Sequence, residues 1–156
     1  MTDQRWTTRI ETAEQMAAFA RHVMADLRAG FPILLSGDIG AGKTTFARAA
    51  LQSVMREPED VPSPTFTIVQ VYDTTLGEVW HSDLYRLESV DDVAELGLID
   101  AMETDLCLIE WPEILPPECT RTALSLRLSI RNGDARDVSA TWRHPYWGQK
   151  LAALAA

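Results

Sequence analysis

The 156-residue sequence predicts a single α/β domain, residues 1–156, with a mostly parallel central sheet flanked by helices and an antiparallel hairpin near its C-terminal end. Short, uninterrupted apolar runs predict the parallel strands, because such strands are buried on both faces. Segments with apolar residues three or four positions apart lie between these runs and predict helices that cover the sheet. A strictly alternating segment that ends at Asn132-Gly133 predicts the hairpin.

The first third of the chain is predicted to form a helix, a buried strand and a second helix. Residues 12–15, Thr-Ala-Glu-Gln, have the form of a capping box that opens the first helix. Its apolar residues keep a helical period as far as Leu27, and Gly30 is expected to close it as the C′ residue. The apolar run over residues 31–36 predicts the strand, and residues 43–55 return to a helical period.

Two paired strands are predicted in the middle of the chain. Residues 66–72 are mainly β-branched and aromatic, which is typical of a strand, and Gly77 marks a turn. Residues 78–84 are expected to form the return strand. Alternation along this strand puts His81 and Asp83 on the same face.

A short helix and another buried strand are predicted next. Ser89 is followed by the acidic residues of a helical first turn, and this helix is expected to end near Gly97. Residues 106–109 are all apolar and predict a fully buried strand that finishes at Glu110. The sequence therefore predicts an acid at the carboxyl end of a central strand.

The C-terminal part is predicted to be antiparallel. Residues 124–130 alternate between apolar and polar side chains, and Asn132-Gly133 supplies the two positive φ angles of a type I′ turn. Residues 134–142 are expected to form the partner strand, and residues 142–156 a tail or short helix.

Charge and composition limit the function classes. The 14 Lys and Arg residues against 23 Asp and Glu give a formal charge of −9, so we expect no autonomous binding to nucleic acid. Cys107 and Cys119 lack metal-ligand spacing and are expected to be reduced thiols. No run reaches the roughly 18 apolar residues of a membrane span, and the N-terminus has no apolar leader, which predicts a cytoplasmic protein without membrane contact.

Residues 37–44 match the motif G-x-x-x-x-G-K-[ST] between a predicted strand and a predicted helix. Lys43 is expected to reach the β- and γ-phosphates of a nucleotide, Thr44 to offer its hydroxyl to Mg²⁺, and Thr45 to donate near the α-phosphate. A glycine-rich turn with a surface lysine is the alternative, and the matching flanks disfavour it. The loop residues expected to cradle the phosphates are Asp38, Ile39, Gly40, Ala41 and Gly42.

A phosphate-binding loop also needs a carboxylate that holds Mg²⁺ through water, at the end of a neighbouring strand. Glu110 has this position, although a solvated acid at a strand end is the alternative. Asp83 is the second candidate, and its alternative role is to pair with a nearby backbone group or with Arg86.

Four further residues have two interpretations each. Arg86 could stabilise charge on the γ-phosphate or bind a partner. Thr65, after Ser63-Pro64, could sense the γ-phosphate or belong to a proline-stiffened turn. His81 is expected to be a packed, hydrogen-bonded histidine rather than a metal ligand. Trp111 could cap the core or cover a nucleotide or partner site.

Taken together, five blocks of the sequence resemble the bacterial TsaE family. They occur in the family's order and extend over most of residues 12–142. The H-x-D-L-Y-R and L-I-E-W blocks are more specific than the phosphate-binding loop, which alone would indicate only a superfamily. The five blocks are residues 37–45, Ser63-Pro64-Thr65-Phe66, residues 81–86, Glu95-Leu96-Gly97-Leu98 and residues 108–112.

The resemblance implies a P-loop ATPase, with ATP and Mg²⁺ as cofactors, needed to make N6-threonylcarbamoyladenosine in tRNA. Members of the family work with TsaB and TsaD and use ATP to let that complex turn over, so tRNA is reached only through the complex. By matching positions, Lys43 holds phosphate, Thr44 and Glu110 serve Mg²⁺, and Asp83 takes part in hydrolysis or in positioning metal-bound water. Arg136 is the equivalent of a C-terminal residue that contributes toward the nucleotide.

Other function classes stay open at this point. A small-molecule or nucleotide kinase would also need the loop and Mg²⁺, together with an acceptor pocket and a lid. A nucleotide-gated docking module would use ATP to order residues 63–65, and hydrolysis would be incidental. The absence of an N-K-x-D guanine signature disfavours a GTPase. We expect weak ATPase activity in isolation, because no residue is an unambiguous general base.

Overall fold

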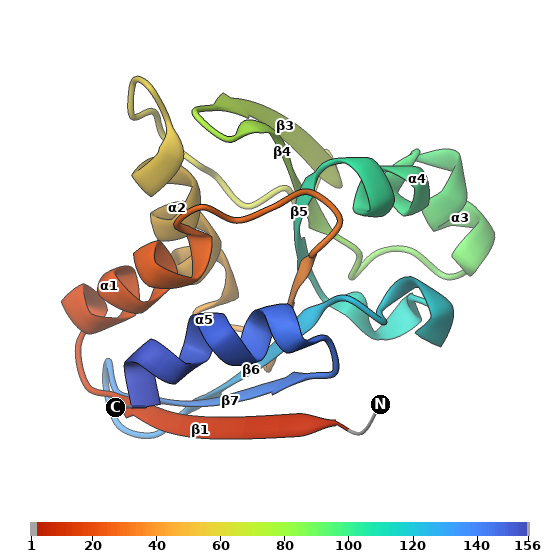
Figure 1. The fold of residues 1–156 in the computed structure, drawn as a ribbon. Helices are drawn as coiled ribbons and strands as arrows, with labels where there is room; N and C mark the ends of the chain where they lie inside the picture. The colour runs from red at the N-terminus through yellow and green to blue at the C-terminus, as the bar shows by residue number, and fades with distance from the viewer. Residues whose placement is uncertain (1–2, 156) are drawn as a thin grey trace.

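The computed structural model describes residues 3–155, so Met1, Thr2 and Ala156 of the predicted domain lie outside the described residues. These residues form a seven-stranded sheet in the order β1-β7-β6-β2-β5-β4-β3 (Figure 1). The strands are β1 Gln4–Ile10, β2 Ile33–Ser36, β3 Val69–Thr74, β4 Gly77–Asp83, β5 Leu106–Glu110, β6 Leu124–Ile130 and β7 Arg136–Trp142. The helices are α1 Ala13–Met24, α2 Lys43–Val54, α3 Val90–Glu95, α4 Leu98–Thr104 and α5 Pro145–Ala155, with 3₁₀ turns at Pro112–Ile114 and Pro117–Cys119.

The centre of the sheet is parallel and both of its edges are antiparallel. β2 pairs in parallel with β5 and β6, and β4 pairs in parallel with β5. β3 is antiparallel to β4, and β7 is antiparallel to both β6 and β1. The predicted α/β class with a C-terminal antiparallel pair is confirmed. Strand β1 was not predicted, although Arg5, Thr7 and Arg9 alternate along it with the more buried Trp6, Thr8 and Ile10.

Two apolar clusters lie on opposite faces of the sheet. Helices α1, α2 and α5 enclose the larger cluster, which includes Ile33 and Leu35 of β2. Helices α3 and α4 enclose the smaller one, which includes Leu34. Burial on both faces explains why β2 reads as an uninterrupted apolar run. No described helix is long and apolar enough to span a bilayer.

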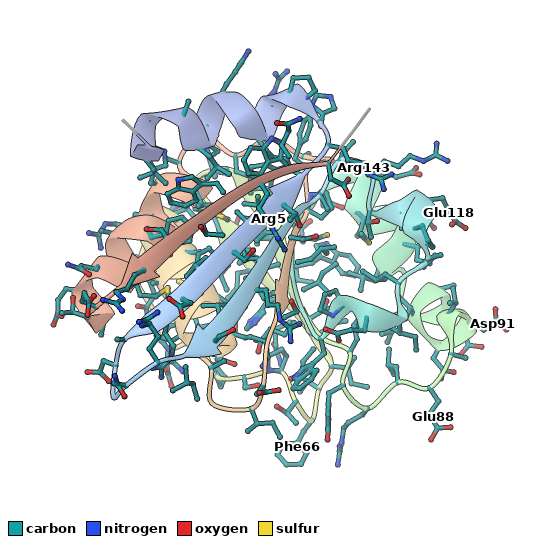
Figure 2. The ribbon with its side chains drawn as sticks, turned by 90° about the horizontal axis from the view of Figure 1, so that it is seen from below. Arg5, Phe66, Glu88, Asp91, Glu118 and Arg143 are labelled. Atoms are coloured by element: carbon teal, nitrogen blue, oxygen red, sulfur yellow. The ribbon has the colours of Figure 1, made fainter. Side chains whose placement is uncertain are left out.

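The two faces are not covered equally. Figure 2 shows β1, β7 and β6 crossing the front of the molecule with no helix over them, and Arg5 lying on this open face. In Figure 1, α3 and α4 cover the neighbouring part of the sheet, near β5 and β4. The open face therefore ends where the parallel centre begins.

The start of α1 follows the prediction and its end does not. Thr12 is the N-cap, and its hydroxyl accepts a hydrogen bond from the N–H of Gln15 at 3.1 Å. The helix ends at Met24, so the prediction of Gly30 as its C′ residue was wrong. Asp26 has a φ of 54°, which turns the chain out of the helix. Leu27 is nevertheless buried in the core, so the helical spacing of apolar residues continues beyond the last turn of the helix.

Two further predictions were wrong, namely the type of turn between the last two strands and the start of β3. The connection between β6 and β7 is not a type I′ turn. In its central pair, Asn132-Gly133, only Gly133 has a positive φ, and the N–H of Ala135 bonds to the carbonyl of Asn132. Strand β3 begins at Val69 rather than at residue 66, since Ile68 has a φ of 69° and its N–H bonds back to Pro64. Helix α4 was missed altogether. The predicted helix at residues 43–55, the short helix after Ser89 and the strand ending at Glu110 are confirmed.

Candidate nucleotide-binding site

The glycine-rich loop joins the carboxyl end of β2 to the start of α2. Gly37 has a φ of 137°, and a Cβ there would lie 2.3 Å from the carbonyl oxygen of Leu128 on β6. No other amino acid fits at this close approach. Gly42, with a φ of 109°, is the N-cap of α2, and the first turn of this helix contains no acidic residue. The positive end of the helix dipole is therefore not neutralised by its own side chains.

Lys43 is folded against the loop that carries it. Its side chain is buried, and Nζ donates to the carbonyl oxygens of Gly37 at 2.6 Å and Asp38 at 2.9 Å. The ammonium also lies 4.2 Å from the centroid of the Trp111 ring. Burial lowers the pKa of Lys43, whereas the charges of Glu110 and Asp83 act to raise it. The ammonium is thus held by loop carbonyls, and the carboxylates of two neighbouring strands favour its charged form.

Glu110 is at the centre of the site. It ends β5 with 2 % of its surface exposed, and its Oε1 accepts a hydrogen bond from the Thr44 hydroxyl at 2.8 Å. Its Oε2 lies 2.6 Å from Nε2 of His81. His81 is fully buried and hydrogen-bonded, as the sequence predicted. The three residues come from α2, β4 and β5, so the parallel pairing of the two strands brings them together.

Asp83 ends β4 directly beside Glu110 in the strand register. Its Oδ1 accepts the N–H of Tyr85 at 3.0 Å, and its Oδ2 accepts the Thr65 hydroxyl at 3.4 Å. Burial raises the pKa of Asp83, and the charge of Glu110 acts in the same direction, while the N–H of Tyr85 and the Thr65 hydroxyl oppose the shift. The Thr65 hydroxyl is also 2.7 Å from that of Ser63.

These groups line one cavity of about 400 Å³. Asp38 and Ala41, which were predicted to bind the cofactor, do not line it: Ala41 is fully buried, and the carbonyl of Asp38 faces Lys43 instead. The predicted site residues that line the cavity are Ile39, Gly40, Gly42, Lys43, Thr44, Thr45, Thr65, Asp83, Glu110 and Arg136. Ser63, Tyr85 and Trp111 complete the lining.

Tyr85 is a lining residue that sequence reasoning did not assign to the site. Its ring lies 4.8 Å from that of Trp111, centroid to centroid, and 59 % of the residue is exposed. Trp111 itself has a φ of 55°, a conformation rarely adopted by residues other than glycine, and its N–H bonds to the carbonyl of Leu35. The only signal for Tyr85 in the sequence was its place just after a polar strand end.

The two arginines of the prediction lie in different places. Arg136, on β7, donates from Nε to the carbonyl of Ala41 at 2.9 Å and so joins the last hairpin to the loop. Arg86 does not line the cavity; its guanidinium stacks on Phe66, 5.1 Å from the ring centroid. Phe66 projects from the edge of the molecule in Figure 2 and is 82 % exposed.

The residues present fit a magnesium–nucleotide complex. Thr44 and Glu110 offer oxygen atoms, which are the ligands that Mg²⁺ prefers, and the two side chains are hydrogen-bonded to each other. Lys43 and the start of α2 supply positive charge for phosphates. Fold and loop together define the class: an α/β protein with a phosphate-binding-loop sequence between a central parallel strand and a helix.

Comparison with known proteins gives the family. The family model for threonylcarbamoyl adenosine biosynthesis protein TsaE matches residues 10–138. The tRNA threonylcarbamoyladenosine biosynthesis protein TsaE of Rickettsia bellii is 36 % identical over 129 residues, which are 83 % of this chain and 90 % of that protein. The protein of the same name from Bacillus subtilis is 30 % identical over 142 residues, covering 90 % and 87 %. The chain belongs to the TsaE family, as the sequence blocks predicted.

A solved structure has the same fold. The crystal structure of Bacillus subtilis YdiB superposes with a TM-score of 0.75 at 23 % sequence identity, over 99 % of this chain and 97 % of that one. The order and direction of the strands described above are therefore those of a known α/β architecture.

Proposed function

We propose that this protein is a Mg²⁺-dependent ATP-binding protein and ATPase that is required for N6-threonylcarbamoyladenosine modification of tRNA. It would act with the TsaB–TsaD complex to drive turnover, and reach tRNA only through that complex. The observation that carries the proposal is the convergence of the Lys43 ammonium, the Thr44 hydroxyl and the Glu110 carboxylate on one cavity. Membership of the TsaE family supports the link to tRNA modification.

Each side chain has a separate task in this proposal. Lys43 leaves its loop carbonyls and binds the β- and γ-phosphates, while the loop amides and the start of α2 bind the remaining phosphate oxygens. Thr45, the residue after the Mg²⁺-binding Thr44, donates near the α-phosphate. Thr44 and Glu110 hold Mg²⁺, which neutralises charge on the phosphates when bound. Arg136 keeps the loop attached to β7 through the carbonyl of Ala41.

Asp83 is the candidate for orienting the attacking water. Its raised pKa is the property of a carboxylate that accepts a proton more readily than usual. However, both of its oxygens are engaged, by the N–H of Tyr85 and by the hydroxyl of Thr65. We therefore expect slow hydrolysis by the isolated protein. Rearrangement of the Thr65 segment in the complex would free one oxygen and stimulate the reaction.

Phosphate release tests the proposal directly. The rate is measured with Mg²⁺-ATP for the protein alone and with purified TsaB and TsaD, and calorimetry compares ATP with GTP. We expect a slow basal rate, stimulation by the pair, and tighter binding of ATP than of GTP. Equal rates with and without the pair would contradict partner activation, and an absence of ATP binding would contradict the whole proposal.

A nucleotide-gated docking role is the second candidate, because one segment joins the cavity to the surface. Ser63 and Thr65 line the cavity, and the adjacent Phe66 is exposed. Nucleotide binding at Thr65 would therefore change the surface that Phe66 presents. The variant Glu110→Ala separates the two functions. Full tRNA modification without hydrolysis would favour gating, and loss of both in a variant that calorimetry shows still binds ATP would favour the ATPase.

A further inference from the structure

His81 is the partner of Glu110 on the side away from Thr44. Both residues are almost wholly buried, and the 2.6 Å contact between His81 Nε2 and Glu110 Oε2 is the short one of the two that hold this carboxylate. An ionised carboxylate only accepts hydrogen bonds, so Nε2 is assigned as the donor. Among the described residues nothing pairs with Nδ1, the other ring nitrogen. Among the described residues, Glu110 is therefore the hydrogen-bond partner of the His81 ring.

This contact decides which way the carboxylate faces. With Oε2 occupied by His81, the remaining oxygen is directed at Thr44, the residue that shares the proposed metal with Glu110. Without the histidine, Oε2 would be a buried charged atom lacking a donor, and the carboxylate would turn to find one. A turned carboxylate would no longer present Oε1 beside the Thr44 hydroxyl, so the metal position would lose one of its two ligands.

We propose that His81 is a positioning residue for the metal-binding carboxylate: its Nε2–H holds Glu110 Oε2, so that Oε1 and the Thr44 hydroxyl face a Mg²⁺ ion together. The inference rests on the proposed function, since it names what prepares that site for the metal. His81 itself touches neither metal nor nucleotide. Residues that orient metal ligands in this way typically account for a 10- to 100-fold change in metal affinity.

The test measures how much Mg²⁺ improves ATP binding. Calorimetry gives the dissociation constant for ATP in EDTA and in excess Mg²⁺, and the ratio of the two is the gain from the metal. For His81→Leu we expect this gain to fall about tenfold, with ATP affinity in EDTA unchanged. His81→Gln can present an N–H near the position of Nε2 and should keep the gain. His81→Asn, whose amide is too short to reach Glu110, should lose it.

A matched control is available on the same strand. Ser82 is buried, its hydroxyl has no described partner, and it faces the other side of β4 from His81. Ser82→Ala should leave both dissociation constants unchanged, which shows that a change within β4 is tolerated. Thermal unfolding of every variant checks the fold. If His81→Leu does not fold, His81→Asn and His81→Gln decide the question.

The possible outcomes separate this inference from the proposed function. The inference about His81 is supported if the gain from Mg²⁺ is lost in His81→Leu or His81→Asn and is kept in His81→Gln. If Mg²⁺ improves ATP binding by His81→Leu or His81→Asn as much as it does for the wild type, the inference about His81 is overturned and the proposed function still stands. Equal loss of ATP affinity in EDTA and in Mg²⁺ also overturns it, because the histidine would then support the loop rather than the metal ligand. No gain from Mg²⁺ in the unmodified protein would overturn the proposed function as well.

Discussion

The parallel centre of the sheet and its antiparallel half distribute polar residues differently. In β5, every residue is buried, and the one charged side chain is Glu110 at the carboxyl end. In β6, buried leucines alternate with more exposed polar residues from Leu124 to Ser129, among them Arg127. On the open face of Figure 2 no helix covers the strands, and polar residues such as Arg127 and Ser129 are exposed there. In the centre, a polar residue is buried, and any polar atom left without a partner there costs free energy.

This difference shows which polar residues carry information about function. The buried charged residues of β4 and β5 lie at the strand ends, where Asp83 and Glu110 line the cavity and His81 contacts Glu110. Burying them costs stability that apolar residues would not cost, so their presence needs a functional reason. The exposed polar residues of β6, such as Arg127 and Ser129, need none, because they face water, whereas Arg136 of β7 lines the cavity.

The largest contrast is expected when one positive charge is removed from each region. Lys43→Ala should lower the rate of ATP hydrolysis in the complex by about 10²- to 10³-fold, since a buried cation aimed at the phosphates is lost. Arg127→Ala, on the exposed face of β6, should change the rate less than about twofold. The measurement is phosphate release with the partner pair. Similar losses in both variants would mean that the open face also takes part in the activity.

Stability should follow the alternation of β6. Leu126 is fully buried in the larger cluster, and Leu126→Ala should cost about 2 to 5 kcal/mol of unfolding free energy through lost contacts and a cavity. Ser129→Ala, exposed on the same strand, should stay within about 0.5 kcal/mol of the wild type. Urea denaturation measures both. A large cost for Ser129→Ala would show that the open face is packed against something in solution.

The smallest expected effect is the loss of stability that comes from burying the charge of Asp83. Its raised pKa means that the folded protein binds this proton more tightly than the unfolded chain, so stability falls as pH rises from below the ordinary carboxyl pKa through the raised value. Asp83→Asn removes that loss while its side-chain oxygen can still accept from Tyr85. Its melting temperature at pH 7 should exceed that of the wild type by less than about 5 °C. The difference should vanish below about pH 4, and a variant less stable at pH 7 would contradict the assignment.

Local patterns predicted most of the elements and most of the cavity lining. Thr12 as a cap, the apolar runs of β2 and β5, and the loop before Lys43 could all be identified because their signals lie within a few residues of each other. The boundary errors lie at Gly30 and at residue 66, where a regular pattern extended beyond the element, and Asn132-Gly133 did not form the predicted type I′ turn, while β1 and α4 were missed. At those positions distant packing, rather than local propensity, sets where the chain turns.

The sequence by itself determined the α/β class, the phosphate-binding loop and the acid at the end of a buried strand, because each depends on neighbouring residues. Only the tertiary structure decided that Glu110 stands between Thr44 and His81, and that Arg136 reaches Ala41 across 95 residues of chain. The order of strands in the sheet makes these contacts. That order follows from packing of the whole chain, since the pattern within a strand sets which face is buried and does not choose its neighbours.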